Sequence, residues 1–236
     1  MRYITTSWDD GHPSDERLAG LLGKYNLKGT FYIPQVNPGH RVMNEKEIAR
    51  LSRDFEIGGH TLGHVNLKHL SAEKAKKEIE GSYNWLTAVA GTAPVSFCPP
   101  FGAYSHQSLS LIHAAGFRVV RTTELLSPRW MPGMLPTTLQ VYEHSPFTYF
   151  KHLLKRGRFR DLRLWRGSRF TGDTFRLLDH YIEFIANHGG CLHLWGHSWE
   201  IDNNRHWDKL ERIFSRISQL PGFSYVENRQ LAKTDA

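Results

Sequence analysis

Strand-like and helix-like stretches alternate along almost the whole chain, and this alternation limits the folds that the sequence can adopt. Short apolar, β-branched runs that end in Gly, Pro or Asp are separated by stretches with helical periodicity. Such alternation is typical of a parallel sheet covered by helices. The predicted strands cover residues 3–7, 29–33, 56–59, 95–99, 117–122, 139–142, 191–195 and 223–226, and the clearest helices cover 15–25, 45–53, 71–90, 107–115, 174–187 and 207–219.

Seven or eight strand-helix units in a chain of 236 residues favour an α/β fold of the distorted (β/α)7-8 barrel type over an open two-sided sheet. The hydrophobic fraction of 40% is enough to form a substantial core. We expect one domain spanning residues 1–236. The stretch at about 126–170 interrupts the alternation with prolines and basic residues, and we interpret it as an elaboration on the barrel.

The formal net charge of +7 is concentrated in one stretch. Residues 151–169 contain eight Lys or Arg and a single acid, Asp161. This stretch is either a solvated basic face or a docking edge for an anionic glycan or lipid head group. The sequence has neither zinc-finger spacing nor an RNA-binding aromatic motif, so we expect no nucleic-acid partner.

Membrane and secretion signals are missing from the sequence. It holds no run of eighteen apolar residues, and residues 2–6 enter a strand pattern without a leader peptide. The two cysteines, Cys98 and Cys191, are too few for a disulfide framework, although a single bridge between them is left open. We therefore predict a soluble, cytoplasmic protein with no transmembrane segment. The sequence does not indicate its oligomeric state.

Potentially catalytic residues follow four of the predicted strands. The blocks SWDDG, GGHTLGH, CPPFG and LWGHSWEID come after the first, third, fourth and seventh strands. Because active groups collect at the carboxyl ends of strands in such barrels, we expect these blocks to meet. Successive strand residues point to opposite faces, so the adjacent Asp9 and Asp10 can serve two roles, one facing a cation and the other a substrate.

Two histidine pairs have a spacing of four residues. In a helical turn, His60 and His64 share one face and can bind one metal ion, with Asp10 as an oxygen ligand. His193 and His197 lie in a strand pattern, where this spacing corresponds to roughly 13 Å, too far for one ion. The first pair is therefore the candidate for metal binding.

The four blocks resemble the motifs of the polysaccharide deacetylase family, the NodB-homology enzymes of the carbohydrate esterase family 4 type. The family's T-F-D-D-G motif appears as SWDDG (7–11), and its H-[ST]-x-x-H motif appears as HTLGH (60–64). Its R-x-P-[FYW]-G motif appears as CPPFG (98–102), and its final histidine appears in LWGH (194–197). The resemblance implies a TIM-like barrel and a metal-dependent hydrolase of carbohydrate metabolism that removes N-acetyl groups from an amino sugar.

The resemblance also implies roles for individual residues. One divalent metal ion is expected, most often zinc, although cobalt, nickel or iron also suits two imidazoles and a carboxylate. The implied roles are metal ligation by Asp10, His60 and His64, general base for Asp9, general acid for His197, and an oxyanion contact from the backbone N–H of Phe101. His193 is the alternative to His197 as the acid.

The sequence departs from the family at the arginine that orients the base, which is replaced by Cys98. The family's Asp-Trp pair is also missing from the region 116–127. We predict that Arg121 supplies the lost positive charge to Asp9; the alternative is that Arg121 is an ordinary surface cation. Five further residues are predicted either to contact substrate or to have packing and loop roles: Trp8, Pro100, Trp195, Trp199 and Glu200.

The predicted substrate is an N-acetylated carbohydrate in a glycan, glycolipid or sugar conjugate, anionic or lipid-linked. Two alternatives are a hydrolase of another small amide or cyclic ureide on the same barrel, and a non-catalytic glycan-binding relative. The sequence does not identify the sugar, its chain length, the metal or the pathway.

Overall fold

A parallel β-sheet forms the centre of the computed structural model, which describes residues 1–232. Its strand order is β6-β5-β4-β3-β2-β1-β8-β7, and β9 pairs with β1. The strands are β1 (Arg2–Asp9), β2 (Thr30–Ile33), β3 (Glu56–Gly59), β4 (Ser96–Phe97), β5 (Val119–Arg121), β6 (Met134–Leu135), β7 (Leu139–Gln140), β8 (Gly190–Gly196) and β9 (Ser224–Tyr225). All of their pairings are parallel within the described residues.

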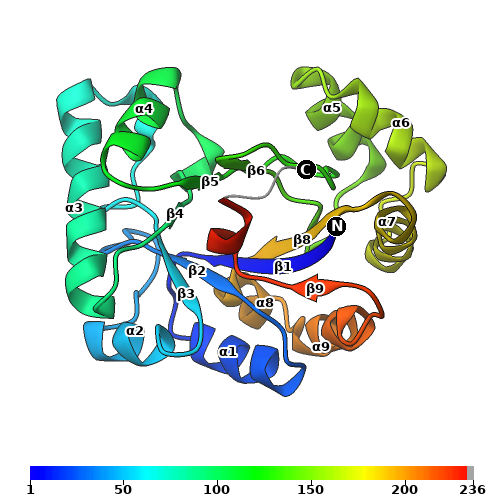
Figure 1. Cartoon of the computed structure of the whole chain (residues 1–236), viewed down its shortest axis with the longest axis horizontal. Coiled ribbons are helices and arrows are strands. Elements are labelled where there is room, and N and C mark those ends of the chain that lie inside the picture. The colour runs from blue at the N-terminus through cyan, green and yellow to red at the C-terminus, as the bar shows by residue number, and fades with distance from the viewer. Residues whose placement is uncertain (233–236) are drawn as a thin grey trace.

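Helices surround the curved sheet (Figure 1). They are α1 (Asp15–Lys24), α2 (Glu45–Leu51), α3 (Ala72–Ala90), α4 (His106–Ala114), α5 (Pro146–Lys155), α6 (Phe159–Gly167), α7 (Thr174–His188), α8 (Ser198–Asn203) and α9 (Trp207–Ile217). Short 3-10 turns occur at Leu67–His69, Pro100–Gly102 and Asn228–Ala232. The predicted distorted (β/α) barrel is confirmed.

The stretch at 126–170, predicted as an elaboration on the barrel, takes part in the sheet. It contributes β6 and β7, the two ends of the strand order, and then forms α5 and α6. The sequence patterns predicted neither β6 nor α8, because two-residue strands and a six-residue helix are too short to show a clear period. Among residues 1–232, no helix combines the length and the apolar character needed to cross a membrane.

Apolar faces of the helices pack on the outside of the sheet. In α9, the buried Leu210, Ile213, Phe214 and Ile217 recur at helical spacing on one face. Phe214 contacts the ring of Trp8 edge-on, with the ring centroids 6.0 Å apart. The main hydrophobic core therefore lies between the strands and the surrounding helices.

The inner face of β1 is polar, in contrast to its outer face. Thr5, Ser7 and Asp9 alternate with outward-facing residues, as the pleat requires. Thr5 donates a hydrogen bond to the side chain of Asn228, and the hydroxyl of Ser7 bonds to the His193 ring. Asp9 is thus the last of a row of polar residues that point into the barrel.

Candidate active site

The carboxyl ends of β1, β3 and β8 bring the predicted residues to one pocket. The pocket has a volume of about 580 Å³. Residues from six segments line it: Asp9, Asp10, Asn37, Pro38, Gly39, His40, His60, His64, Pro99, Phe101, Gly102, Thr123, Trp195, His197 and Trp199. The blocks predicted to meet at one end of the barrel do meet there.

Asp9 and Asp10 are separated by a turn of the backbone and not by the strand pleat. Strand β1 ends at Asp9, and Asp10 adopts a left-handed conformation with φ of 80°. Gly11 continues the turn with φ of 61°, where an added Cβ would lie 2.6 Å from a methyl carbon of Ile33. Both carboxylates consequently face the pocket, so the expectation of opposite faces was wrong.

Asp10 lies beside the two histidines predicted to bind metal with it. Its Oδ1 atom is 3.6 Å from Nε2 of His60 and 3.0 Å from Nε2 of His64. The histidines do not belong to a helical turn, as their spacing suggested; they lie in a loop after β3 in which Thr61 and His64 have positive φ. The loop still points both imidazoles at the same carboxylate.

The chemistry of these three side chains fits a cation. Nδ1 of His60 donates a hydrogen bond of 2.6 Å to the backbone oxygen of Cys98, so in the neutral ring Nε2 carries a lone pair. This lone pair faces Asp10 Oδ1, which is buried and accepts no hydrogen bond from the described residues. A positive charge between these acceptors, supplied by a bound cation or by a proton on an imidazole, would stabilise the arrangement.

Asp10 is also held from its other side. The indole N–H of Trp199 donates a 2.8 Å hydrogen bond to Oδ2 of Asp10. Trp199 stacks on His40, with ring centroids 4.1 Å apart. Burial opposes ionisation of Asp10, but His60 and His64 outweigh it and hold its pKa below the ordinary value. Asp10 is therefore an anion available to a metal.

Asp9 is paired with Arg121, which is fully buried at the end of β5. A guanidinium nitrogen of Arg121 donates a hydrogen bond to Oδ1 of Asp9. The guanidinium also lies over the rings of Tyr32 and Trp195, at 5.2 and 4.8 Å from their centroids. The alternative of an ordinary surface cation is excluded.

Burial opposes ionisation of Asp9 too. Arg121 outweighs this effect, with smaller contributions from His60 and His197, and keeps the pKa of Asp9 below its usual value. Asp9 is accordingly a carboxylate at neutral pH, able to accept a proton from a group in the pocket.

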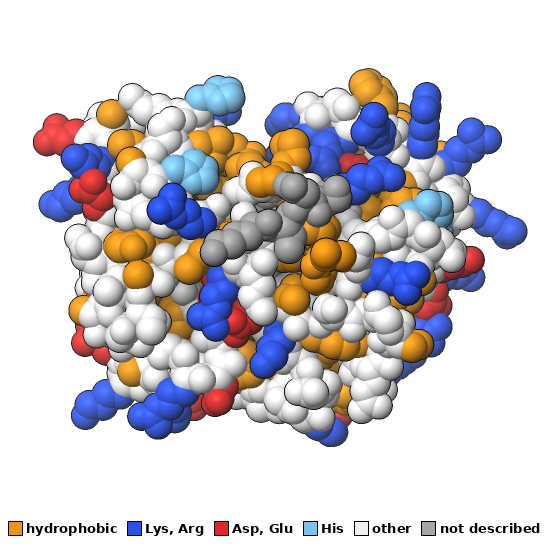
Figure 2. Space-filling view, in the orientation of Figure 1, with side chains coloured by type: hydrophobic (Ala, Val, Ile, Leu, Met, Phe, Trp, Pro, Cys, Tyr) orange, Lys and Arg blue, Asp and Glu red, His pale blue; other side chains and the backbone are white. Residues whose placement is uncertain are grey.

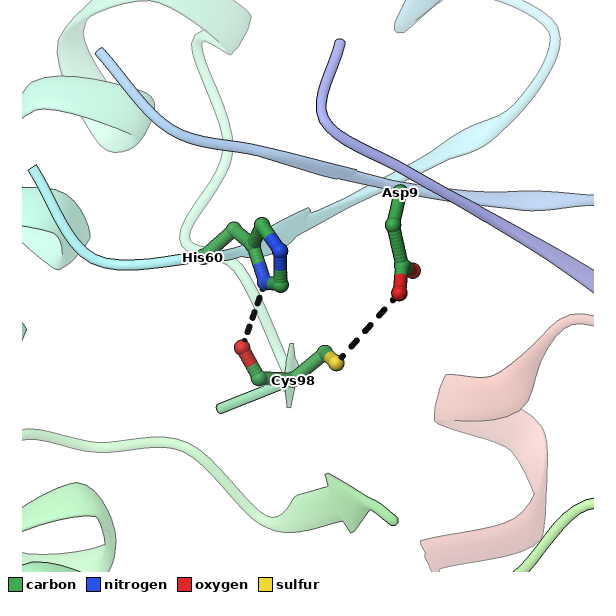
Figure 3. A group of neighbouring side chains, drawn as sticks. All are labelled: Asp9, His60 and Cys98. Atoms are coloured by element: carbon green, nitrogen blue, oxygen red, sulfur yellow. Dashed lines mark hydrogen bonds between the residues drawn. The ribbon is translucent and has the colours of Figure 1, made fainter. Parts of the chain in front are cut away.

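Cys98 lies between His60 and Asp9 (Figure 3). Its Sγ is 3.8 Å from Oδ2 of Asp9, and its backbone oxygen accepts the His60 bond. Asp9, His60 and Cys98 form a second group with metal-ligand atoms within 4.8 Å of one another. Burial raises the pKa of the Cys98 thiol well above its ordinary value, and Asp9 already binds Arg121, so this group is the weaker metal candidate. Cys98 and Cys191 are both free and buried.

His197 directly follows β8 and lines the pocket. Its Nδ1 is 2.7 Å from Oε2 of Glu200, and its Nε2 is 4.0 Å from Oδ2 of Asp10. Burial lowers the pKa of His197, but Glu200, Asp9 and Asp10 outweigh this and raise it. Tyr142 fixes the backbone here, because its hydroxyl donates to the His197 carbonyl and accepts from the His197 amide.

The remaining predicted residues divide into two groups. Trp195 and Trp199 line the pocket, as does Phe101, whose backbone has φ of 60° and whose side chain is exposed. Trp8 is fully buried in the core and Pro100 is buried outside the pocket lining, so neither is placed to contact substrate. His193 is also fully buried: its Nδ1 donates to the Pro136 carbonyl and its Nε2 bonds to Ser7.

The sequence analysis missed the loop after β2. Asn37 and His40 line the pocket, and His40 supports Trp199 through stacking. The signal was present, because a Pro- and Gly-containing loop with a histidine follows the carboxyl end of a predicted strand.

The amino-acid sequence is similar to those of known deacetylases. Residues 1–120 match the family model described as polysaccharide deacetylase. The chain is 30% identical over 126 residues to a chitooligosaccharide deacetylase of Azorhizobium caulinodans, covering 50% of this chain and 56% of the relative. It is 26% identical over 120 residues to a peptidoglycan-N-acetylglucosamine deacetylase of Bacillus cereus, covering 50% and 43%. The chain thus spans about half the length of these curated relatives.

Solved structures share the fold along nearly the whole chain. A peptidoglycan N-acetylglucosamine deacetylase matches with a TM-score of 0.62 and 16% identity, over 99% of this chain and 89% of the other. A CE4 family pseudoenzyme from Bacillus anthracis matches with a TM-score of 0.57 and 14% identity, over 98% and 65%. With a parallel barrel, four motif blocks meeting in one pocket and a family model that matches just over half of the residues, this chain belongs to the polysaccharide deacetylase family.

Proposed function

We propose that this protein is a metal-dependent hydrolase that removes the N-acetyl group from an amino sugar in a glycan, glycolipid or sugar conjugate. The observation that carries the proposal is the convergence of Asp10, His60 and His64 beside an anionic Asp9 and a basic His197. The relatives named chitooligosaccharide deacetylase and peptidoglycan-N-acetylglucosamine deacetylase support the same class of substrate.

Asp10, His60 and His64 would hold the metal ion. Zinc is the ion proposed first, because two imidazoles and a carboxylate with open positions form a common catalytic zinc site. A divalent ion bound here would polarise the amide carbonyl and lower the pKa of an attacking water. Trp199 and the Cys98 carbonyl would orient the ligands through their hydrogen bonds to Asp10 and His60.

The protein's own groups would then move the protons. Asp9, oriented by Arg121, accepts a proton as water attacks the acetyl carbonyl. The backbone N–H of Phe101 is proposed to donate to the oxygen that becomes negative. His197, kept protonated by Glu200, delivers a proton to the sugar nitrogen as the C–N bond breaks, which gives acetate and a free amine. The pocket walls at Trp195 and Trp199 are placed to contact the sugar.

A non-catalytic glycan-binding role is the second candidate, favoured by Cys98 at the position of the family's arginine. The fold neighbour described as a CE4 family pseudoenzyme is a precedent for a member without activity. The burial of Arg121 against Asp9 supports the catalytic role instead, since a binder has no need for a buried cation behind a carboxylate base.

Acetate release from N-acetylated chitooligosaccharides and from peptidoglycan fragments tests the proposal. The purified protein is assayed after loading with zinc, cobalt, nickel or iron, beside Asp9→Asn with the same metal content. Metal-dependent acetate release that Asp9→Asn abolishes supports the hydrolase. Sugar binding without acetate release, for every metal, would establish the non-catalytic alternative. Cleavage of small amides or cyclic ureides, without cleavage of the N-acetylated sugars, would show that the protein is a hydrolase of those compounds. A cytoplasmic location stays a prediction.

A further inference from the structure

The α5–α6 surface combines positive charge with exposed hydrophobic side chains. We define it by residues 147–170. Residues 151–169 contain eight Lys or Arg and one acidic residue, which gives a charge of +7, the same as the formal charge of the whole chain. In the rest of the protein, the numbers of basic and acidic residues are therefore equal. Figure 2 shows these cations gathered over α5 and α6, at the upper right.

Most of the cations on this surface are free of acidic partners. Arg156 and Arg158 form ion pairs with Glu124, and Arg158 also pairs with Asp161. The other six have no carboxylate oxygen within 4 Å among residues 1–232: Lys151, Lys155, Arg160, Arg163, Arg166 and Arg169. Their charge is available to an external anion.

The outward face of α5 is also apolar. Tyr149 and Leu153 point inward and are buried, whereas Phe147, Phe150 and Leu154 recur at helical spacing on the outside. Their exposed fractions are 72%, 43% and 43%. Phe159 and Phe170 are exposed as well, so residues 147–170 hold five of the nine large hydrophobic side chains that are exposed among the described residues. Leaving these groups in water is unfavourable, which indicates a partner with apolar surface.

We infer that the α5–α6 surface docks on the surface of an anionic lipid bilayer. A basic amphipathic helix with aromatic residues on its apolar side is suited to the boundary between head groups and acyl chains. Anionic head groups complement the six free cations, and the acyl region accepts Phe147, Phe150 and Leu154. Docking would be peripheral, as α5 has only ten residues.

Other partners fit this surface less well. A second copy of the chain would bring two strongly basic patches together, which is repulsive. A soluble anionic glycan would neutralise the cations but offers no acyl layer for the exposed phenylalanine and leucine side chains. Both hydrophobic and electrostatic requirements are met by a lipid surface.

The position of α5 connects this surface with the candidate site. Tyr142, whose hydroxyl bonds to the His197 backbone, lies four residues before the first residue of α5, Pro146. The docking helix is thus joined to the acid side of the pocket by a short segment. If the proposed deacetylase function holds, the substrate class favoured by this placement is an amino sugar linked to a lipid.

Vesicle co-sedimentation tests docking independently of any enzymatic activity. The full chain is mixed with vesicles of phosphatidylglycerol and phosphatidylcholine in equal parts, and with vesicles of phosphatidylcholine alone. We expect binding to the anionic vesicles, weakened by salt. Each cation near an anionic leaflet strengthens binding by about fivefold, so Arg160→Gln/Arg163→Gln/Arg166→Gln is expected to weaken it by about 100-fold.

The apolar half of the surface is tested by Phe147→Ser/Phe150→Ser/Leu154→Ser, which is also expected to weaken vesicle binding. The matched control is Lys74→Gln/Lys76→Gln/Lys77→Gln, which removes three exposed cations from α3 and should leave binding unchanged. Circular dichroism and thermal melting verify that each variant folds.

Three outcomes would overturn the inference. The first is a wild-type chain that does not bind anionic vesicles. The second is an α3 control that weakens binding as much as the α6 variant, which would indicate a nonspecific charge effect. The third is equal affinity for heparin and vesicles with no loss in the serine variant, which would identify the surface as a site for soluble polyanions.

Discussion

The two sides of the candidate site are built in different ways. The proposed metal side, Asp10, His60 and His64, comes from two short motifs that lie within residues 7–64. The proton-transfer side depends on pairs that are distant in sequence or divergent from the family: Arg121 contacts Asp9 across 112 residues, and Glu200 holds His197 at the end of the last long strand. The family model itself matches only residues 1–120.

The difference indicates which parts of the proposed site in this chain depend on fixed positions. Three ligands around one ion have a fixed geometry, so none can move to another strand without loss of the site. A cation that orients a carboxylate needs only to reach it. Here the positive charge comes from β5, while β4 leads to the neutral Cys98. The proposed metal side therefore requires all three ligands at fixed positions, whereas the cation on the proton-transfer side can come from a different strand.

The largest effect is expected on the metal side. Asp10→Ala removes the carboxylate that both histidines face, so we expect loss of bound metal and a decrease in kcat/KM of about 1,000-fold or more, since the ion contributes several kcal/mol to transition-state stabilisation. Metal content by mass spectrometry and acetate release measure the two effects. Asp54→Ala, an exposed carboxylate on the surface, is the control. Full metal content in Asp10→Ala would show that the ligand set is wrong.

Arg121→Met should have the next largest effect. It leaves Asp9 buried without its cation, so the pKa of Asp9 rises and the acidic limb of kcat/KM moves to higher pH. We expect activity near neutral pH to fall by about 100-fold, the usual contribution of a general base. An acidic limb that stays in place would remove Arg121 from the mechanism.

Loss of a buried ion-pair partner also destabilises a fold, by about 3–5 kcal/mol. A rescue variant separates the two effects. Cys98→Arg/Arg121→Met returns the arginine to the family's usual position, and we expect it to recover part of the activity and stability lost in Arg121→Met. Rescue of stability alone would indicate that the pair is structural.

Glu200→Gln should have a smaller effect, on the acid side. Glu200 helps to raise the pKa of His197, and glutamine keeps a hydrogen bond without the charge. The pKa of His197 then falls, so the alkaline limb of the kcat/KM profile moves to lower pH, with a loss of about tenfold for each pKa unit. Glu183→Gln on the exposed side of α7 is the matched control and should leave the profile unchanged.

The smallest effect concerns stability and not activity. Burial lowers the pKa of His193 to about 3, well below that of the unfolded chain. Between pH 6 and 3 the unfolded chain binds a proton that the folded protein does not, so His193 reduces the stability by about 1.4 kcal/mol for each unit of decreasing pH. His193→Gln should flatten this dependence, as measured by urea unfolding. An unchanged slope would show that His193 is protonated in the fold.

The sequence predicted the barrel, and it predicted that Asp10, His60 and His64 lie together, through local patterns. Strand and helix alternation identifies the architecture, and the DDG and HxxxH blocks contain the three candidate ligands within short stretches of sequence. Their binding of a metal stays a prediction. The sequence predicted Arg121 by resemblance, from the loss of an arginine at position 98. The contact with Asp9 depends on how β5 and β1 curve toward each other, which no local pattern encodes.

The errors in prediction have physical causes. Trp8 was predicted either to stack on a sugar or to pack in the core, and strand alternation turns it outward into the core against Phe214. The His60 and His64 spacing suggested a helical turn, whereas residues with positive φ produce the same convergence in a loop. Asn37 and His40 were missed because their loop carries no recognisable motif. Only its position after the carboxyl end of a strand indicated a role in the site.

The two native cysteines have a practical consequence for studying this protein. Cys98 and Cys191 are both buried, and burial raises the pKa of each thiol. Thiolate-directed dyes should therefore leave the folded wild-type chain unlabelled. A cysteine introduced by Phe150→Cys would accept a single fluorophore without removal of the native thiols. With a polarity-sensitive dye, the emission wavelength would change when position 150 moves from water into an apolar environment.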